Sequence, residues 1–189
     1  MTQAYELMQS HRFFRPDAEV RFPNMLGRIS YFQRYYPARG RRRQNEFSTT
    51  LLDLKKRREY AIEHFAERLI EVLEWDFVIA VAPSSDPEKV DSGIRAVAEQ
   101  VLEQGYWVDA TDCLIRRTAV EPAHRGGSRE WDDHYESIEL DCPIIGQDVL
   151  LLDDITTTGT SLKVCREILL ECGGARSVKM MAMGKTIEY

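Results

Sequence analysis

The residues best suited to chemistry are two adjacent carboxylates, Asp153 and Asp154, and the hydroxyl-rich loop that follows them. The carboxylates would repel a phosphate, but they can accept hydrogen bonds from a neutral diol such as that of a ribose. The loop has the opposite preference, because hydroxyl groups, a glycine and the N–H groups of a helix start favour an anion. Its members are Thr157, Thr158, Gly159, Thr160 and Ser161. Together the two groups predict a site for a ribose 5-phosphate.

The elements around these residues have the order that such a site needs. Val149–Leu152 is a short, unbroken apolar run, which is typical of a parallel strand buried on both faces. The acids follow this strand, and an amphipathic helix is predicted over 159–172. The alternative is a buried strand that ends in a polar turn, with the acids only capping the helix.

A second loop follows the predicted strand Phe77–Val81. Small and polar residues at the end of a central strand can bind an anion through backbone N–H groups. An ordinary turn before the next helix, capped by Ser or Asp, explains the same residues equally well. The candidate residues of this second anion site are Ala82, Pro83, Ser84 and Ser85.

A long stretch without periodicity, residues 118–131, carries Arg125 and Arg129 beside two glycines. Loops of this length inside a compact domain usually have a function or are disordered. A cationic loop could close over a diphosphate, exclude water and neutralise its charge. A plain surface excursion is the alternative.

Helical and strand patterns alternate along most of the chain, which predicts an α/β protein with a central parallel sheet flanked by helices. One kinked helix or two helices are expected from Ser48 to Leu73, and the basic run Lys55–Arg58 is expected to face solvent. A strand is expected over 134–140. Since ligands bind at the carboxyl ends of parallel strands, the three loops should meet at one edge.

The first 47 residues are set apart by aromatic and basic side chains, so we divide the chain into a segment 1–47 and a domain 48–189. Residues 1–58 hold thirteen Lys and Arg against five Asp and Glu, whereas the remainder holds twelve against twenty-six. The acidic body argues against broad nucleic-acid binding. The basic run Arg39–Arg43 could still meet a nucleic acid or a phosphorylated substrate, or form a solvated loop.

No stretch approaches the ~20 apolar residues of a membrane span, and the N-terminus lacks the pattern of a secretory signal. We therefore expect a cytoplasmic protein that does not enter membranes. Its four cysteines form no C-x-x-C pair, so a zinc ribbon is not expected.

The stretch 149–161 resembles the phosphoribosyl-diphosphate (PRPP) motif of the type I phosphoribosyltransferases: four apolar residues, two acids, then a Thr/Gly loop. The order of elements from about Phe47 to Lys185 resembles a ComF-type or orphan member of this family, with Leu114–Thr118 and Cys165–Thr186 similar to ComF segments. ComF relatives usually carry an N-terminal zinc ribbon, which this chain lacks. The resemblance implies the type I phosphoribosyltransferase (Rossmann-like) fold.

It also implies an enzyme that transfers ribose 5-phosphate from PRPP to a nitrogenous base and releases pyrophosphate. In that case the loop 157–161 would hold the 5-phosphate, Ala82 to Ser85 the pyrophosphate, and Arg125 or Arg129 would close over it. Asp153 and Asp154 would face the ribose and an oxocarbenium-like centre, with Mg²⁺ held mainly through PRPP and in part by these acids. The acceptor base is not specified, and the aromatic N-terminal segment would suit a homodimer contact. The alternative is a non-catalytic, PRPP-sensing regulator that binds nucleic acid through its basic N-terminal region.

Overall fold

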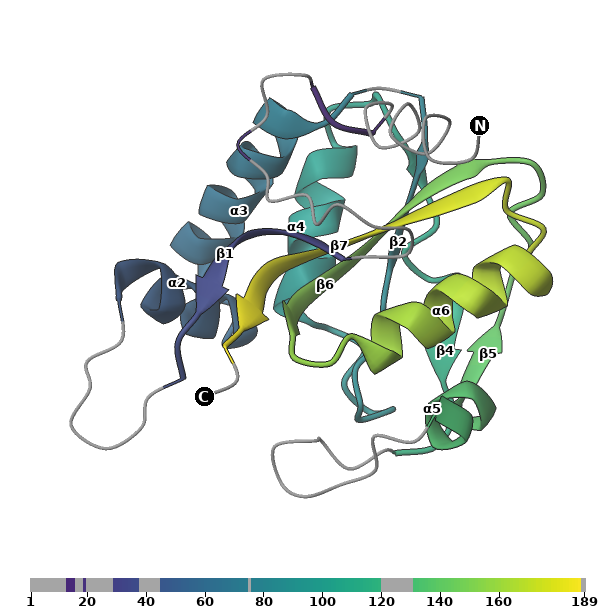
Figure 1. Cartoon of the computed structure of the whole chain (residues 1–189). Coiled ribbons are helices and arrows are strands. Elements are labelled where there is room, and N and C mark those ends of the chain that lie inside the picture. The colour runs from purple at the N-terminus through teal and green to yellow at the C-terminus, as the bar shows by residue number, and fades with distance from the viewer. Residues whose placement is uncertain are drawn as a thin grey trace, which may run out of the picture.

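The computed structural model describes residues 13–15, 19, 29–37, 45–74, 76–119 and 131–187. Within them, five strands form a sheet in the order β1-β7-β6-β2-β3, in which every neighbouring pair is parallel. β4 and β5 form a separate antiparallel pair. The strands are β1 (Ser30–Tyr35), β2 (Val78–Val81), β3 (Val108–Asp109), β4 (Leu114–Arg116), β5 (Ile138–Leu140), β6 (Asp148–Thr156) and β7 (Ser177–Thr186). The helices are α2 (Glu46–Lys55), α3 (Glu59–Val72), α4 (Gly93–Leu102), α5 (Trp131–Ser137) and α6 (Thr160–Glu171). The predicted α/β class, a central parallel sheet flanked by helices, is confirmed (Figure 1).

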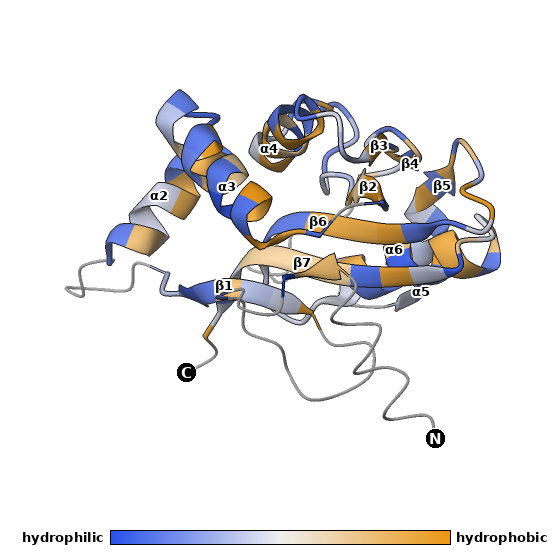
Figure 2. Ribbon diagram, turned by 90° about the horizontal axis from the view of Figure 1, so that it is seen from above, coloured by the Kyte–Doolittle hydropathy of each residue, from blue (hydrophilic) through white to orange (hydrophobic). Residues whose placement is uncertain are grey.

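The central strand β6 separates two apolar cores because its side chains alternate between the two faces of the sheet. Leu150 and Leu152 pack with residues of α2, α3 and α4, whereas Val149 and Leu151 pack with residues of α6. Figure 2 shows α2, α3 and α4 together on one side of the sheet, with hydrophilic and hydrophobic residues mixed along α3 and α4. All four β6 residues are fully buried, as the apolar run predicts.

The N-terminal part of the chain contributes to this architecture. β1 is an edge strand that pairs with β7, and Phe32 of β1 lies in the core beneath α2 and α3. Phe13 and Phe14 are also buried, and Phe14 forms an isolated antiparallel bridge with Leu73. The division of the chain at residue 47, and a hood or interface role for the segment before it, stay predictions.

Several boundaries differ from those that the sequence predicts. Residues 134–137 belong to helix α5, so the strand predicted over 134–140 is confirmed only for Ile138–Leu140. The alternation there is short, and the acidic residues Asp132 and Asp133 favour a helix start. Two helices, α2 and α3, are present rather than one kinked helix. No helix in the described ranges is long and apolar enough to cross a membrane.

Candidate functional site

The strand order places a topological switch point between β2 and β6. From β2 the chain crosses through α4 to β3 on one side, and from β6 it crosses through α6 to β7 on the other. In open parallel sheets the helices on either side of such a point diverge, and ligands bind in the crevice that they leave at the carboxyl ends of the strands. The loops that follow β2 and β6 are the two that carry the predicted anion-binding residues. The fold therefore brings residues 82–85 and 153–161 to one edge.

Strand β6 extends beyond its neighbour β2, and the acidic pair lies on this extension. Pairing between the two strands ends at Val81 and Leu152, whereas β6 continues along β7 as far as Thr156. The sequence predicted that the strand ends before the acids, and this boundary is wrong by four residues. Asp153 and Asp154 are thus held by strand geometry, with one flank of β6 left open where β2 has ended.

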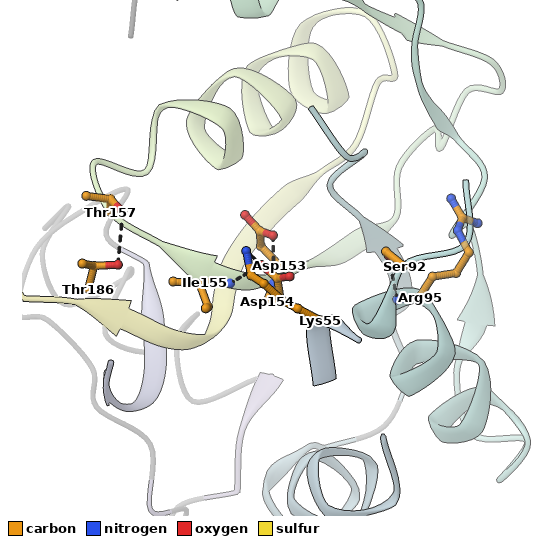
Figure 3. A network of polar contacts seen from close by, with 8 residues as sticks. All are labelled: Lys55, Ser92, Arg95, Asp153, Asp154, Ile155, Thr157 and Thr186. Atoms are coloured by element: carbon orange, nitrogen blue, oxygen red, sulfur yellow. Dashed lines mark hydrogen bonds and ion pairs between the residues drawn. The ribbon is translucent and has the colours of Figure 1, made fainter. Parts of the chain in front are cut away.

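A cation approaches the acidic pair from each face of the sheet. Lys55, the last residue of α2, places its Nζ 3.4 Å from Oδ1 of Asp154 (Figure 3). Arg116 comes from β4, on the face covered by α6, and acts electrostatically on Asp153. Backbone N–H groups also contribute, since Asp153 Oδ1 accepts from the N–H of Asp154 at 2.8 Å and Asp154 Oδ1 accepts from that of Ile155 at 2.5 Å.

These surroundings change the pKa values of the pair and of its lysine. Burial raises the pKa of Asp153 to about 7, and the negative charge of Asp154 adds to this effect. Lys55, the N–H of Asp154 and Arg116 act in the opposite direction without cancelling it. Partial burial lowers the pKa of Lys55, but Asp154 and Asp153 outweigh it and leave that pKa above its ordinary value. The edge therefore holds a carboxyl group that exchanges its proton near neutral pH beside one that is ion-paired.

The threonine-rich loop connects this strand end to the start of α6. Gly159 is the N-cap residue and adopts φ +78°, a left-handed conformation that favours glycine. Thr157 donates its hydroxyl to Thr186 Oγ1 at 3.1 Å, which ties the loop to the end of β7. Thr158 and Thr160 share a hydroxyl hydrogen bond at 3.1 Å. The N-cap glycine has no side chain to cap α6, and the N–H of Thr160 donates to Thr158 Oγ1 in a long hydrogen bond of 3.5 Å.

The loop after β2 is held at its first residues. The N–H of Ala82 donates to Leu152 O at 2.9 Å, and Ser84 Oγ accepts from the N–H of Asp86 at 3.2 Å. The carbonyl oxygen of Ser84 accepts from Nε of Arg116 at 2.9 Å. Ala82 thus lies against the residue that precedes the acidic pair, and Arg116, which was not predicted as part of the site, holds the backbone at Ser84. The assignment of Ala82 to Ser85 as an anion site stays a prediction.

Arg116 links this loop to the antiparallel pair β4–β5. Its side chain is 5% exposed, and besides Ser84 it donates to the hydroxyl of Ser137, where α5 meets β5. Most of the predicted loop 118–131 lies outside the described residues, which end at 119 after β4 and resume at 131 with α5. Arg125 and Arg129 lie outside the described residues, so their roles stay predictions.

The sequence analysis missed Lys55 and Arg116 as members of this edge, although each carries a periodic signal. Lys55 follows Phe47 and Leu51 at four-residue intervals, which puts it on the buried face of α2. Its side chain is still 44% exposed, as the prediction that the basic run faces solvent requires, but its ammonium also pairs with Asp154. Arg116 shares the strand period of two with the buried Leu114.

The acidic pair fits a metal only in a limited way. Among the described residues, no group of three or more His, Cys, Asp or Glu side chains is placed to hold a metal ion. Mg²⁺ commonly takes one or two protein carboxylates and completes its shell with water and substrate phosphate. The donors Asp153 and Asp154 therefore suit a magnesium ion that is held mainly through a phosphorylated ligand.

Comparison with known proteins adds little to this geometry. No family model matches the chain, and a search of curated proteins finds no relative. Two crystal forms of a hypoxanthine phosphoribosyltransferase from Staphylococcus aureus resemble it at 14% identity. The tetragonal form gives a TM-score of 0.40 over 72% of this chain and 74% of that one. The orthorhombic form gives 0.41 over 73% and 75%.

Likeness at this level is too weak to bear on function. Neither structure is described as a ComF protein, so the ComF-like assignment stays a prediction.

Proposed function

We propose that this chain is a phosphoribosyltransferase-like protein that binds PRPP with Mg²⁺ and transfers ribose 5-phosphate to a nitrogenous base. One observation carries the proposal. The acidic pair lies on the part of β6 that extends beyond β2, and the start of α6, with Gly159 as its N-cap, follows directly. Both lie at the switch point of the sheet, where the loop 82–85 also begins. This arrangement supports the proposal, because a phosphorylated sugar with a diphosphate would need an anion site on either side of a site for its hydroxyl groups.

The 5-phosphate is assigned to the loop 157–161. The N–H groups at the start of α6 and the hydroxyl groups of Thr158 and Thr160 would donate to its oxygens. Lys163, whose Nζ lies 3.3 Å from the carbonyl oxygen of Thr158, adds a positive charge next to this loop. Gly159 keeps the main chain free of a side chain at the closest approach.

The ribose is assigned to the acidic pair. Hydroxyl groups of the sugar would donate to Asp153 and Asp154, which orients the ring. In the transfer, the bond between the anomeric carbon and the diphosphate oxygen breaks, and a bond from that carbon to the base nitrogen forms. The nitrogen then loses its proton to solvent water. Positive charge develops on the sugar in between, and the nearby carboxylates would stabilise it.

The diphosphate is assigned to residues 82–85. Arg116 holds the carbonyl oxygen of Ser84, so the N–H groups of this loop are oriented before the ligand arrives. Mg²⁺, when bound, would neutralise the departing diphosphate charge. Arg125 and Arg129 are proposed to close over it.

The test is a screen of nucleobases and small amines with PRPP and Mg²⁺ that measures pyrophosphate release. Asp154→Asn should abolish turnover and leave the far-UV circular dichroism unchanged. Asp148→Asn is the matched control, because the same exchange at the amino end of the same strand leaves the site untouched. Full turnover in Asp154→Asn would disprove the ribose assignment.

A second candidate is a PRPP-binding regulator that does not catalyse transfer and that binds nucleic acid. The basic surplus of residues 1–58 favours it. Calorimetry would then show PRPP binding, but none of the tested acceptors would cause the release of pyrophosphate from PRPP. The protein would also retain RNA or DNA at low salt. Neutralising Arg39, Arg41, Arg42 and Arg43, which lie outside the described residues, should abolish that retention.

A further inference from the structure

Lys55 differs from the three basic residues that follow it. Lys56 pairs within its own helix turn with Asp53 at 3.1 Å, and its side chain is 63% exposed. Lys55 instead reaches across to β6 and pairs with Asp154, whose side chain is 19% exposed. Of this basic run, it is the residue that the structure places against the proposed ribose subsite.

The position of Lys55 follows from the tight packing of α2. A Cβ at Gly93, the first residue of α4, would lie 1.9 Å from the carbonyl oxygen of Leu54, so the two helices touch through their backbones. On its other side, α2 lies against β7, where a Cβ at Gly184 would lie 2.4 Å from Cδ2 of Leu51. The end of the helix is therefore fixed, and its last side chain has the open edge of the sheet in front of it (Figure 3).

The contact uses one side of the Asp154 carboxylate. Oδ1 accepts from the N–H of Ile155 and faces the ammonium of Lys55, whereas Oδ2 has no hydrogen-bond or ion-pair partner within the described residues. The adjacent Asp153 also feels the lysine charge. Lys55 is thus the flexible one of the two cations that compensate the acidic pair, which would otherwise attract a divalent cation strongly.

We propose that Lys55 is the resident counter-cation of the acidic pair and competes with a divalent metal ion for Asp154. A bare divalent ion must displace the ammonium and leave it without a partner near the pair. A metal ion bound to a diphosphate brings an anion that can become the new partner of Lys55. The edge therefore selects the metal–diphosphate complex over either component alone. This selection rests on the proposed function, whereas the competition for Asp154 does not.

The competition is tested with Mn²⁺ alone, by electron paramagnetic resonance of the free ion at pH 7.5. Lys55→Met should bind Mn²⁺ about tenfold more tightly than the unmodified protein, because removing a unit charge at this distance is worth roughly that factor. Lys55→Arg retains the charge and should keep the weak affinity. Lys56→Met removes a neighbouring charge that pairs elsewhere and should change nothing. Asp154→Asn combined with Lys55→Met should lose the gained affinity.

Equal Mn²⁺ affinity in Lys55→Met and the unmodified protein, or no binding by either, would overturn the proposal. An equal gain in Lys56→Met would also overturn it, since the effect would then reflect net charge only. A second titration uses PRPP with Mg²⁺, for which Lys55→Met should bind about tenfold more weakly. If the unmodified protein binds no PRPP, the proposed function fails, while the Mn²⁺ result still decides the role of Lys55.

Discussion

Asp153 should make the folded protein less stable as the pH rises from 6 to 8. In the folded chain this carboxyl group has a pKa of about 7, whereas its ordinary value is 3.8. Over this range the folded state holds a proton that the unfolded state has already released. The free energy of unfolding changes with pH in proportion to the number of protons bound by the unfolded state minus the number bound by the folded state. This difference is negative here. The free energy of unfolding contributed by this group therefore falls as the pH rises through 7.

The size of the effect follows from the two pKa values. Between pH 6 and pH 8 the contribution of Asp153 drops by about 1 kcal/mol. With a urea slope of about 2 kcal/mol per molar, that is a shift of roughly 0.5 M in the unfolding midpoint. The range lies above the isoelectric point of about 5.3, near which the protein would lose solubility.

The assay is urea unfolding followed by circular dichroism at both pH values, for the unmodified protein and for Asp153→Asn. His64 and His134, whose pKa values burial lowers, give the opposite slope, but they do so in both proteins. The difference between the two proteins therefore isolates Asp153. If both midpoints move in parallel between pH 6 and pH 8, Asp153 is not protonated in the folded state and its assigned environment is wrong.

Three further substitutions test the packing around the site. Gly93→Ala should lower the melting temperature measured by calorimetry by roughly 5 °C, because the new Cβ would clash with the carbonyl oxygen of Leu54. At an exposed position in a helix, the same exchange would instead raise the stability of the protein. Asp148→Asn should lower the free energy of unfolding in urea by about 2 kcal/mol, since the buried carboxylate accepts two hydrogen bonds from Arg176. PRPP binding should stay unchanged, because the proposed site lies at the other end of the strand. Gly159→Ala should cost about 1 kcal/mol of stability and weaken PRPP binding in calorimetry, because φ +78° strains any side chain there; unaltered binding would argue against this loop as the phosphate subsite.

The central elements of the fold could be predicted because their signals are local. The apolar run of β6 and the amphipathic pattern of α6 can each be recognised within about a dozen residues of sequence. The observed helix, Thr160–Glu171, lies within the predicted range 159–172. β1 was not predicted, since an edge strand with exposed Gln33 and Arg34 shows little apolar alternation. It is defined by its pairing with β7, which is a tertiary contact.

The end of β6 was predicted too early for a similar reason. Acidic residues are poor strand formers, so a pattern-based boundary stops before Asp153. β7 is ten residues long and continues to pair with β6 through Thr156, which keeps the acids in strand geometry. The length of β7 therefore decides where β6 ends, and the residues next to Asp153 and Asp154 in the sequence do not reveal that length.

The two cations of the site escaped prediction because charge compensation is also a tertiary property. A carboxylate doublet at a partly buried edge is costly unless positive charge is nearby, so the sequence motif implies counter-charges without naming them. They come from positions 55 and 116, nearly a hundred residues before β6 in one case, and they arrive from opposite faces of the sheet. Their chemistry also differs. Arg116 is buried and bound to two oxygen atoms, which makes it a fixed support, whereas Lys55 is 44% exposed and can exchange its partner. A ligand that enters this edge can therefore displace the lysine and leave the arginine in place, which is why metal selectivity should respond to position 55.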